Sequence, residues 1–289
     1  MDERAVLQEL AAYLPAAGDD AAVVDGLVLT TDMLHETTDF PKGTTRYTAG
    51  WRSVGASLSD VAAMGADPVA AVAVYGAPEF DWDEIRAFVD GARTVCEAVG
   101  SEYVGGDLDG HEEFTVATTA VGRADTPVGR DGATPGDVVC VTGSLGRSGA
   151  ALRLFEQDED ERANGLFQFE PRITAGTVLG QYATAMMDSS DGLARSLHQL
   201  AEASDCGFAV ESPLPIADVV DDVADSEDDY RELGVFFGED FELVCTLPEE
   251  AVARAREELS VPLTRIGSVT ESGITLDGEA LPDRGYTHG

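Results

Sequence analysis

Apolar and polar positions repeat with two different periods along this chain, which indicates that strands and helices are mixed in both of its halves. In the first half, two short apolar runs flank Asp25-Gly26, a dipeptide typical of a tight β-hairpin turn. Asp81 precedes a long amphipathic stretch and is placed to cap a helix there. The pattern predicts a helix over 3–14, a hairpin over 21–24 and 27–31, a helix over 44–63, a strand over 69–75, a helix over 82–99 and a strand over 114–121.

A polar, glycine-rich joint at 129–137 separates this half from a second one with the same mixture of elements. A chain of 289 residues is long enough for two domains of about 150 residues each. We therefore predict an α/β fold of the mixed α+β type with two domains, 1–130 and 131–289. The second half is predicted to contain strands over 138–142, 185–187 and 242–247, helices ending at Phe155 and over 174–183, 193–203 and 249–259, and a final strand pair near 265–277.

Charge sets this chain apart. Asp and Glu number 55 against 18 Lys and Arg, a formal net charge of −37, yet 44% of the residues are hydrophobic and can form a core. So much negative charge argues against sequence-independent nucleic-acid binding, which needs a positive surface. Lys42 is the one lysine among the bases. This composition indicates adaptation to high salt, where a Debye length of about 3 Å at 1 M screens the carboxylates from one another. We expect stability and activity to rise with salt into the molar range.

Neither export nor membrane insertion is expected. The start, Met1-Asp2-Glu3-Arg4, has no basic segment followed by an apolar one, and no apolar run approaches the ~18 residues of a membrane span. The four histidines lack the spacing of a zinc site. The cysteines are far apart and form no CxxC pair, which favours reduced thiols and a cytoplasmic location: Cys96, Cys140, Cys206 and Cys245.

The acidic residues fall into two groups. The runs 156–161 and 218–229 are typical of solvated surface, on a charged helix face or in a loop. A second group stands among glycines, serines, threonines and apolar residues, where carboxylates are rare unless they are paired or bind a metal. Mg²⁺ prefers oxygen ligands and commonly joins carboxylates to substrate phosphates, so this group is a candidate metal site. Its members are Asp19, Asp20, Asp32, Asp60, Asp107, Asp109, Asp188 and Asp191.

Each of these acids also has a simpler structural explanation. Ser190 or Asp191 could cap the helix that follows them. Asp19 could form an Asx-turn after Gly18, and Asp107 could belong to a turn after two glycines. Five separate segments would need five such explanations, and this favours a shared function.

A phosphate-binding loop is harder to identify than a metal site. The chain contains no GxxxxGK[ST], so a P-loop kinase or ATPase is not expected. The segment 142–149 leads from a predicted strand into a helix and could present backbone N–H groups to an anion, although a plain tight turn explains it equally well. No Ser-His-Asp or Cys-His arrangement indicates a nucleophile.

Taken together, the glycine-rich and acidic segments form an ordered series. GDDAAV begins at Gly18, TTD at Thr30, LSDVAAMGADP at Leu58, GGD at Gly105, RDGATPGDVVCVTG at Arg130, DSSDGL at Asp188 and GEDFEL at Gly238. In this order the series resembles the thiamine-monophosphate kinase family, within the aminoimidazole-ribonucleotide synthetase superfamily. No single motif is decisive, but the ordered set is specific, and it runs from about Gly18 to Leu243.

The resemblance implies two domains, each with a mixed sheet packed on helices, and a homodimer formed through the sheets of the N-terminal domains. It implies that ATP phosphorylates thiamine monophosphate to thiamine diphosphate with several Mg²⁺ ions. By motif match, the metal ligands and their supports would be Asp20, Thr30, Thr31, Asp32, Asp60, Asp107, Asp188 and Asp191. Catalysis would rest on Asp60, Asp191 and Arg130, ATP binding on Gly106, Asp107, Arg130 and Ser190, and substrate binding on Asp39, Glu239 and Tyr286.

Elementary chemistry agrees with these implied roles. Phosphoryl transfer needs in-line positioning and neutralised phosphate charge rather than a covalent intermediate, so no phosphoenzyme is expected. Arg130 can clamp phosphate with its guanidinium fork, although an inter-domain salt bridge is the alternative. Glu239 can pair with the cationic thiazolium or an aminopyrimidine nitrogen, although a surface acid near a strand start is the alternative.

The chain departs from the family pattern in its substrate loop. Where the family usually has a His-Phe pair after TTD, this chain has Asp39-Phe40, and the nearest histidine is His35. Tyr286 could supply the aromatic ring that family members often place over thiamine, or it could lie in a frayed terminus. Other ATP-dependent enzymes of the superfamily, such as aminoimidazole-ribonucleotide synthetase or selenophosphate synthetase, remain alternatives, as does a non-catalytic Mg-nucleotide-binding protein. GEDFEL favours the thiamine enzyme, and an early catalytic cysteine is missing.

Overall fold

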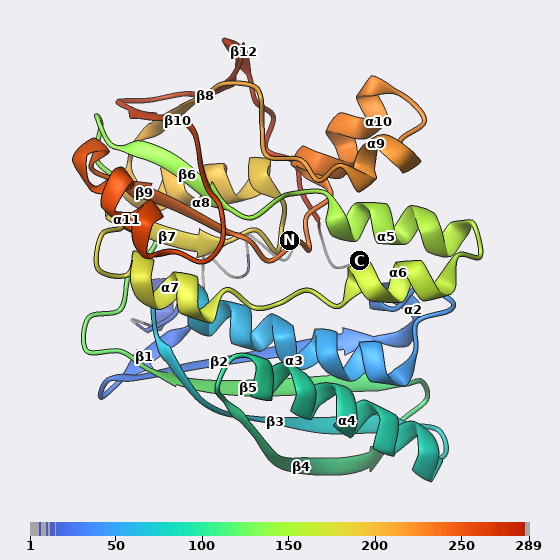
Figure 1. Cartoon of the computed structure of the whole chain (residues 1–289). Helices are drawn as coiled ribbons and strands as arrows, with labels where there is room; N and C mark the ends of the chain where they lie inside the picture. Colours follow the sequence, from blue (N-terminus) through green and yellow to red (C-terminus); the bar gives the residue numbers. More distant parts are fainter. Residues whose placement is uncertain (1–5, 7–9, 11, 15, 287–289) are drawn as a thin grey trace.

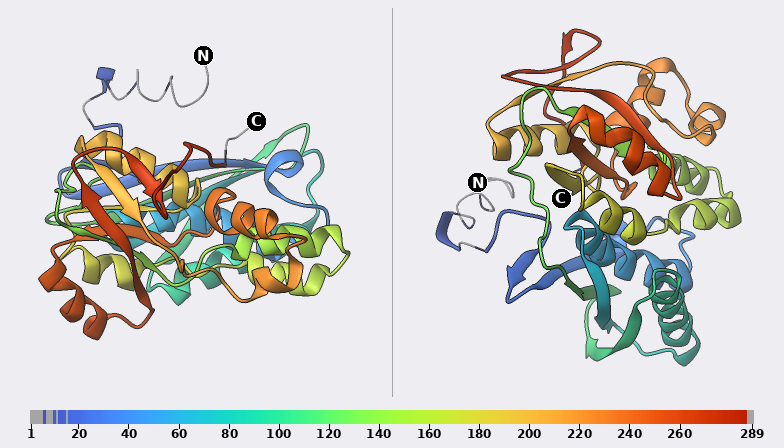
Figure 2. Two further views of the ribbon diagram at one scale, coloured as in Figure 1. Left: turned by 90° about the horizontal axis from the view of Figure 1, so that it is seen from above. Right: turned by 60° about the vertical axis from the view of Figure 1, so that its left-hand side comes forward.

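The computed structural model describes residues 6, 10, 12–14 and 16–286, which form two β-sheets with helices packed between and around them (Figure 1). The sheet drawn from blue to green is built by the first half of the chain and lies below the sheet of the second half, in which β6 is light green and the other strands run from yellow to red. Figure 2 shows both sheets from two further sides. The helix predicted over 3–14 lies largely outside the described residues.

The first sheet has five strands in the order β1-β2-β5-β3-β4. The predicted hairpin is confirmed, with Asp25 and Gly26 both at positive φ in the turn. The strands predicted over 69–75 and 114–121 are also confirmed, each slightly longer than expected. The bounds are β1 Ala22–Val24, β2 Leu27–His35, β3 Asp67–Ala77, β4 Glu102–Gly110 and β5 Thr115–Arg123.

Two long helices, α3 (Arg46–Ala63) and α4 (Trp82–Ala98), cover one face of this sheet. Both were predicted, and the Asp81 carboxylate caps α4 by accepting the N–H groups of Asp83 and Glu84. The opposite face of the sheet is open and carries apolar side chains that are 37–54% exposed. On this outer face lie Leu29, Met33, Val72 and Val74.

The second sheet has seven strands in the order β12-β11-β8-β10-β6-β9-β7. Every residue of β6, β7 and β9 is buried, as expected for strands with near-continuous apolar sequence, although β7 stands at the end of this order. The strands predicted over 138–142, 185–187 and 242–247 are confirmed, as is the pair near 265–277. The bounds are β6 Val138–Thr142, β7 Ala185–Asp188, β8 Gly207–Val210, β9 Leu243–Leu247, β10 Leu263–Thr270, β11 Ile274–Leu276 and β12 Glu279–Ala280.

The four helices predicted in the second half are present with changed lengths, whereas α6, α9, α10 and the π-helix η1 were not predicted. The helix predicted over 174–183 is the shorter α7, and the one over 249–259 begins as a 3-10 turn, η2. The bounds are α5 Arg147–Glu156, α6 Asp160–Phe167, α7 Ile173–Leu179, α8 Leu193–Ser204, α9 Val219–Val223, α10 Glu227–Arg231, the π-helix η1 Glu232–Phe236, η2 Glu249–Ala251 and α11 Val252–Glu258. A short helix in the first half, α2, spans Glu36–Asp39.

The two halves share one hydrophobic core. Val54 and Leu58 of α3 belong to the same buried cluster as Met186 of β7 and Cys245 of β9. The predicted boundary at 130–131 lies in the segment between β5 and β6, and it stays a prediction. The four cysteines are unpaired thiols, in agreement with their sequence spacing. No helix within the described part of the chain is long and apolar enough to cross a membrane.

Three strands were missed in the sequence. In β4, Gly105, Gly106 and three acids mask the strand pattern, and the interpretation of Asp107 as a turn residue is wrong because it pairs with Val74 of β3. The other missed strands, β8 with four residues and β12 with two, are too short to show a period. Neighbouring strands impose these structures, so local sequence gives little sign of them.

Candidate active site

Three carboxylates from distant parts of the chain meet where the two halves join. Asp20 comes from the loop before β1, Asp60 from the last turn of α3, and Asp188 from the end of β7. One oxygen of each lies within 4.8 Å of the others. The sequence interpretation had placed all three among the metal ligands, and the fold brings them together.

Hydroxyl groups hold these carboxylates in place. Thr30 of β2 donates a hydrogen bond to Asp60 at 2.5 Å. Asp188, which is fully buried, accepts bonds of 2.6 Å from the hydroxyls of both Ser59 and Ser190. These short bonds fix the direction of the carboxylates, and no guanidinium touches Asp60 or Asp188 within the described chain.

Electrostatics make this cluster costly without a cation. Burial, together with the charges of Asp32, Asp188 and Asp20, raises the pKa of Asp60 well above its ordinary value. Burial and the charge of Asp20 raise the pKa of Asp188 to about 6. Asp60 also stands in the last turn of α3, where the helix dipole disfavours negative charge. Converging oxygen donors with this much repulsion fit a divalent cation such as Mg²⁺.

The side chains of Asp32 and Thr31 point to opposite faces of β2. Asp32 accepts a 2.5 Å hydrogen bond from Ser57 of α3 on the covered face, near Asp60. Thr31 is exposed on the outer face and donates to the carbonyl oxygen of Thr118. Asp32 therefore lies beside the carboxylate cluster, whereas Thr31 faces away from it within one chain.

Arg130 is paired with one of the candidate metal ligands. Its Nε and one terminal nitrogen bind the two oxygens of Asp20 at 3.1 and 2.8 Å, and its backbone N–H donates to Asp19. Burial and the neighbouring Asp20 raise the pKa of Asp19 to about 6, although Arg130 opposes the shift. Arg130 thus forms a salt bridge at the edge of the cluster, but both of its partners belong to the predicted domain 1–130, so it is not the inter-domain bridge of the alternative.

Asp191 and Ser190 do not cap the following helix, so that alternative is wrong. The residue at the N-cap of α8 is Gly192, with no side-chain cap. Ser190 instead bonds to Asp188, and Asp191 accepts a 3.0 Å bond from Gln199. The N–H of Tyr286 donates to the carbonyl oxygen of Asp191, which ties the end of the chain to this loop.

Gly106 and Asp107 are not brought to the cluster within one chain. They lie on β4, which is separated from β2 by β5 and β3. A Cβ at Gly106 would collide with the backbone of Ala73 on β3, so strand packing by itself requires this glycine. A groove of about 560 Å³ runs beside both residues, with walls that include Tyr103, Phe88 and Val89.

The three candidate substrate residues gather at the other end of the site. Asp39 is 4% exposed and accepts bonds from the N–H of His35 at 2.7 Å and from Tyr286 Oη at 3.2 Å. Burial raises the pKa of Tyr286, and the charges of Glu239 and Asp39 raise it further, so all three lie close together. A frayed end for Tyr286 and a surface position for Glu239, which is 8% exposed, are both wrong.

Sequence reasoning missed what the acids of GEDFEL bind. Glu239 pairs with the fully buried Arg52 at 2.6 Å, and Glu242 with Arg172 through two bonds of 2.7 and 2.6 Å. Asp240 accepts the N–H groups of Gly146 and Ser148 at the start of α5, and burial raises its pKa to about 7. The proposed anion site in 142–149 is therefore filled by the chain's own carboxylate. One signal was available, since Arg52 is a lone charge among small and apolar residues.

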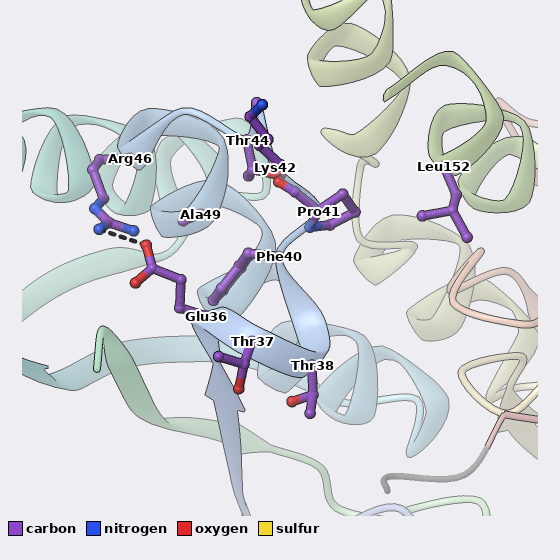
Figure 3. A pocket seen from close by; sticks show the side chains of 11 residues that line it. Glu36, Thr37, Thr38, Phe40, Pro41, Lys42, Thr44, Arg46, Ala49 and Leu152 are labelled. Carbon is purple, nitrogen blue, oxygen red and sulfur yellow. Dashed lines mark hydrogen bonds and ion pairs between the residues drawn. The ribbon is translucent and has the colours of Figure 1, made fainter. Parts of the chain in front are cut away.

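A pocket of about 550 Å³ opens next to α2 (Figure 3). In Figure 3 the Arg46 side chain meets Glu36, at 2.9 Å, on one wall, and Leu152 of α5 lies on the opposite wall. The pocket is also lined by Thr37, Thr38, Phe40, Pro41, Lys42, Gly43, Thr44 and Ala49.

Comparison with known proteins covers both halves of the chain. Residues 18–124 match the model for the N-terminal domain of AIR synthase related proteins, and residues 134–278 match the model for the C-terminal domain. The thiamine-monophosphate kinase of Halobacterium salinarum is 64% identical over the full length of both chains. The solved structure of AaThiL complexed with AMPPCP and TMP has a TM-score of 0.90 at 30% identity and covers 100% of this chain and 97% of its own. A thiamine-monophosphate kinase structure from Stenotrophomonas maltophilia has a TM-score of 0.82 at 33% identity, covering 91% of this chain and 90% of its own.

Proposed function

The chain belongs to the thiamine-monophosphate kinase family and carries its activity, and from this we propose that ATP phosphorylates thiamine monophosphate by direct in-line transfer with Mg²⁺ held by aspartates. The observation that carries the proposal is the meeting of Asp20, Asp60 and Asp188 within 4.8 Å between the two halves of the chain. A relative of the same family, AaThiL, was solved with AMPPCP and TMP. Both substrates carry anionic phosphate groups, and this cluster needs positive charge.

Asp20, Asp60 and Asp188 would hold the metals directly, with Asp32 beside them. Mg²⁺ bound there would neutralise charge on the phosphate oxygens of both substrates. Thr30 and Ser59 keep the Asp60 and Asp188 carboxylates aimed at one point, as outer hydrogen bonds commonly do for metal ligands. Asp191 lies two residues beyond the loop serine Ser189 and would hold a further metal, as the family motif suggests.

Arg130 and Ser190 would contact the phosphates of ATP. Arg130 already lies at the cluster, where its guanidinium fork spans Asp20. Once metals neutralise Asp20, the same fork can turn its donors to phosphate oxygens, for which its geometry is well suited. Arg130 would thereby balance Asp20 before ATP binds and hold phosphate afterwards.

The remaining ATP residues, Gly106 and Asp107, would act from a second copy of the chain. Sheet register places Thr31 and Asp107 on the same outer face, three strand spacings or about 14 Å apart across the sheet and two residues apart along it. Exposed apolar side chains cover this face, as expected of a dimer interface. In a twofold dimer through it, Asp107 of the partner subunit would approach Thr31, which adjoins Asp32 in the chain. The apolar groove beside Gly106 suits a purine ring.

At the other end, Asp39, Glu239 and Tyr286 would bind the thiamine moiety. Two carboxylates can meet the cationic thiazolium and the amino group of the pyrimidine, and the Tyr286 ring offers a flat apolar surface. We further propose that residues 1–130 form the metal-binding and dimerising domain and residues 131–289 the second domain, and that the enzyme works in molar salt.

Product analysis tests the proposal. The enzyme is incubated with ATP, Mg²⁺ and thiamine monophosphate in dilute buffer and in molar KCl, and its fold is checked by circular dichroism. We expect thiamine diphosphate and ADP in equal amounts, with the higher rate in molar KCl. No thiamine diphosphate from folded protein would refute the proposal, and a phosphorylated chain isolated during turnover would refute direct transfer.

Mixed dimers test the role of the second copy. Asp32→Asn and Asp107→Asn are each expected to be inactive, but a heterodimer of the two would keep one intact site if each site combines both subunits. Random mixing should then restore about a quarter of the wild-type rate. Without restoration, Asp32 and Asp107 serve a site within one chain. Full activity of Asp107→Asn by itself would show that Asp107 has no role in the site. Asp109→Asn on the same strand is the matched control and should be active alone.

A further inference from the structure

Arg52 of α3 is a fully buried charge, with no exposed surface. One of its terminal nitrogens donates to the carbonyl oxygen of Phe167 at 3.0 Å. The other donates to the Glu239 backbone oxygen at 3.2 Å and to Glu239 Oε2 at 2.6 Å. Its guanidinium carbon lies 3.6 Å from the centre of the Phe167 ring. One side chain thus joins the first half of the chain to two segments of the second.

This arrangement is expensive as a purely stabilising device. The Nε of Arg52 is buried without a hydrogen-bond partner among the described residues. Burying an ion pair is often no better for stability than packing apolar side chains of the same volume. A buried arginine with an unsatisfied donor therefore calls for another role, and the residue that it holds suggests one.

Arg52 holds Glu239 at both its backbone and its side chain. Glu239 has a φ of +59° and Phe241 a φ of +54°, a left-handed backbone conformation that residues other than glycine rarely adopt. Residues in such conformations cluster at binding sites and persist only where their surroundings enforce them. The N–H of Glu239 also donates to the carbonyl oxygen of Ser190, at 2.6 Å, in the loop that carries Asp188 and Asp191.

The pair leaves one carboxylate oxygen of Glu239 available. Arg52 binds Oε2, whereas Oε1 accepts no hydrogen bond from any described residue. Glu239 also lies close to Tyr286 and Asp39, the other candidate substrate residues. A carboxylate already neutralised by a guanidinium attracts a second full cation only weakly, but its free oxygen remains a good acceptor for an N–H donor.

We propose that Arg52 is a positioning and specificity residue, which fixes Glu239 so that its Oε1 accepts a hydrogen bond from the amino group of the thiamine pyrimidine. The internal countercharge keeps Glu239 from recruiting a metal ion away from the carboxylate cluster. The inference rests on the proposed role of Glu239 in substrate binding. It adds a reason why this carboxylate recognises a hydrogen-bond donor on the substrate and not its positive charge alone.

The first test separates binding of the two substrates. In Arg52→Lys, one ammonium cannot hold both the carbonyl and Oε2 of Glu239 in the same way. We expect KM for thiamine monophosphate to rise about 10- to 100-fold, with KM for ATP and kcat changed less than about threefold. Arg172→Met removes a second buried arginine–glutamate pair and is the matched control, with both KM values unchanged. An unaltered KM for thiamine monophosphate in Arg52→Lys, or an equal rise in both KM values, would overturn the proposal.

The second test uses a substrate analogue whose pyrimidine amino group is replaced by a carbonyl oxygen, with binding measured by calorimetry in the absence of ATP. The wild type should bind the natural substrate at least 100-fold more tightly than the analogue, because two acceptors then face each other. Arg52→Lys should lose most of this discrimination, and so should Glu239→Gln. If Glu239→Gln discriminates like the wild type, the proposed role of Glu239 fails. If Glu239→Gln loses discrimination and Arg52→Lys keeps it, the role of Arg52 alone fails.

Discussion

Two groups of buried acids lie in this molecule, and they differ in what balances their charge. In the cluster of Asp20, Asp60 and Asp188, carboxylates face one another, and among the described residues only Asp20 meets an arginine. In the GEDFEL segment, each acid has a partner of its own within the chain. Glu239 and Glu242 have guanidinium groups, and Asp240 has the N–H groups at the start of α5.

This difference shows that burial by itself does not tell which carboxylates bind a metal. Asp188 and Asp240 are both buried, and both have a raised pKa, of about 6 and about 7. Burial is the main cause for each, but the next contribution is repulsion from Asp20 for Asp188 and attraction from N–H groups for Asp240. A buried carboxylate that the chain neutralises supports the fold. A buried carboxylate that lies among other acids without a partner in the chain requires a bound cation to balance its charge.

The largest effect is expected from Asp60→Asn, which tests whether the carboxylate cluster binds metal. Asn keeps the shape of the side chain and an oxygen for the Thr30 hydroxyl, but it removes the charge that would hold metal. We expect turnover to fall about 1000-fold, or about 4 kcal/mol in activation free energy. The free energy of unfolding without metal should rise, because repulsion is relieved.

The matched control for Asp60→Asn is Asp90→Asn, an exposed acid on α4, which should change neither quantity. Turnover and urea unfolding at molar salt measure the two effects. Near-normal turnover in folded Asp60→Asn would remove Asp60 from the proposed metal site.

The GEDFEL side of the comparison is tested by Arg172→Met. Removal of the guanidinium leaves Glu242, whose side chain is 2% exposed, without its bidentate partner. Such losses typically cost about 3 kcal/mol of unfolding free energy. Magnesium affinity, measured by calorimetry, should stay within about twofold of the wild type because the carboxylate cluster is untouched. A weakened magnesium affinity with unchanged stability would mean that Glu242 belongs to the metal site.

Sequence reasoning identified the acids but not their partners, for a physical reason. Residues such as Asp20, Asp60 and Asp188 stand out because their immediate neighbours are small or apolar, and that signal is local. The N-cap at Asp81 and the turn at Asp25-Gly26 were found for the same reason. The pairing of Arg52 with Glu239 spans 187 positions and depends on the packing of the two halves. Strand β4 depends likewise on its neighbour β3, and its own glycines conceal it.

The smallest effect we predict is a pH dependence that distinguishes Asp188 from Asp240. The folded pKa of Asp188, about 6, lies above its ordinary value of 3.8. The folded protein therefore binds this proton more tightly than the unfolded chain does. The resulting stability is fully present below about pH 4 and is lost as pH rises through about 6, a change of roughly 2–3 kcal/mol. Asp240 acts in the same direction, with its loss near pH 7.

Magnesium should distinguish the pH dependence of Asp188 from that of Asp240, because Mg²⁺ binds only the deprotonated carboxylate cluster. In urea unfolding from pH 5 to 8 at molar NaCl, we expect Mg²⁺ to stabilise the wild type more as pH rises through 6. In Asp188→Asn this increase should be lost. The decline near pH 7 assigned to Asp240 should be the same with Mg²⁺ and with a chelator, since no metal replaces the N–H groups of α5. A Mg²⁺ effect independent of pH in the wild type would show that Asp188 holds no proton for the metal to displace.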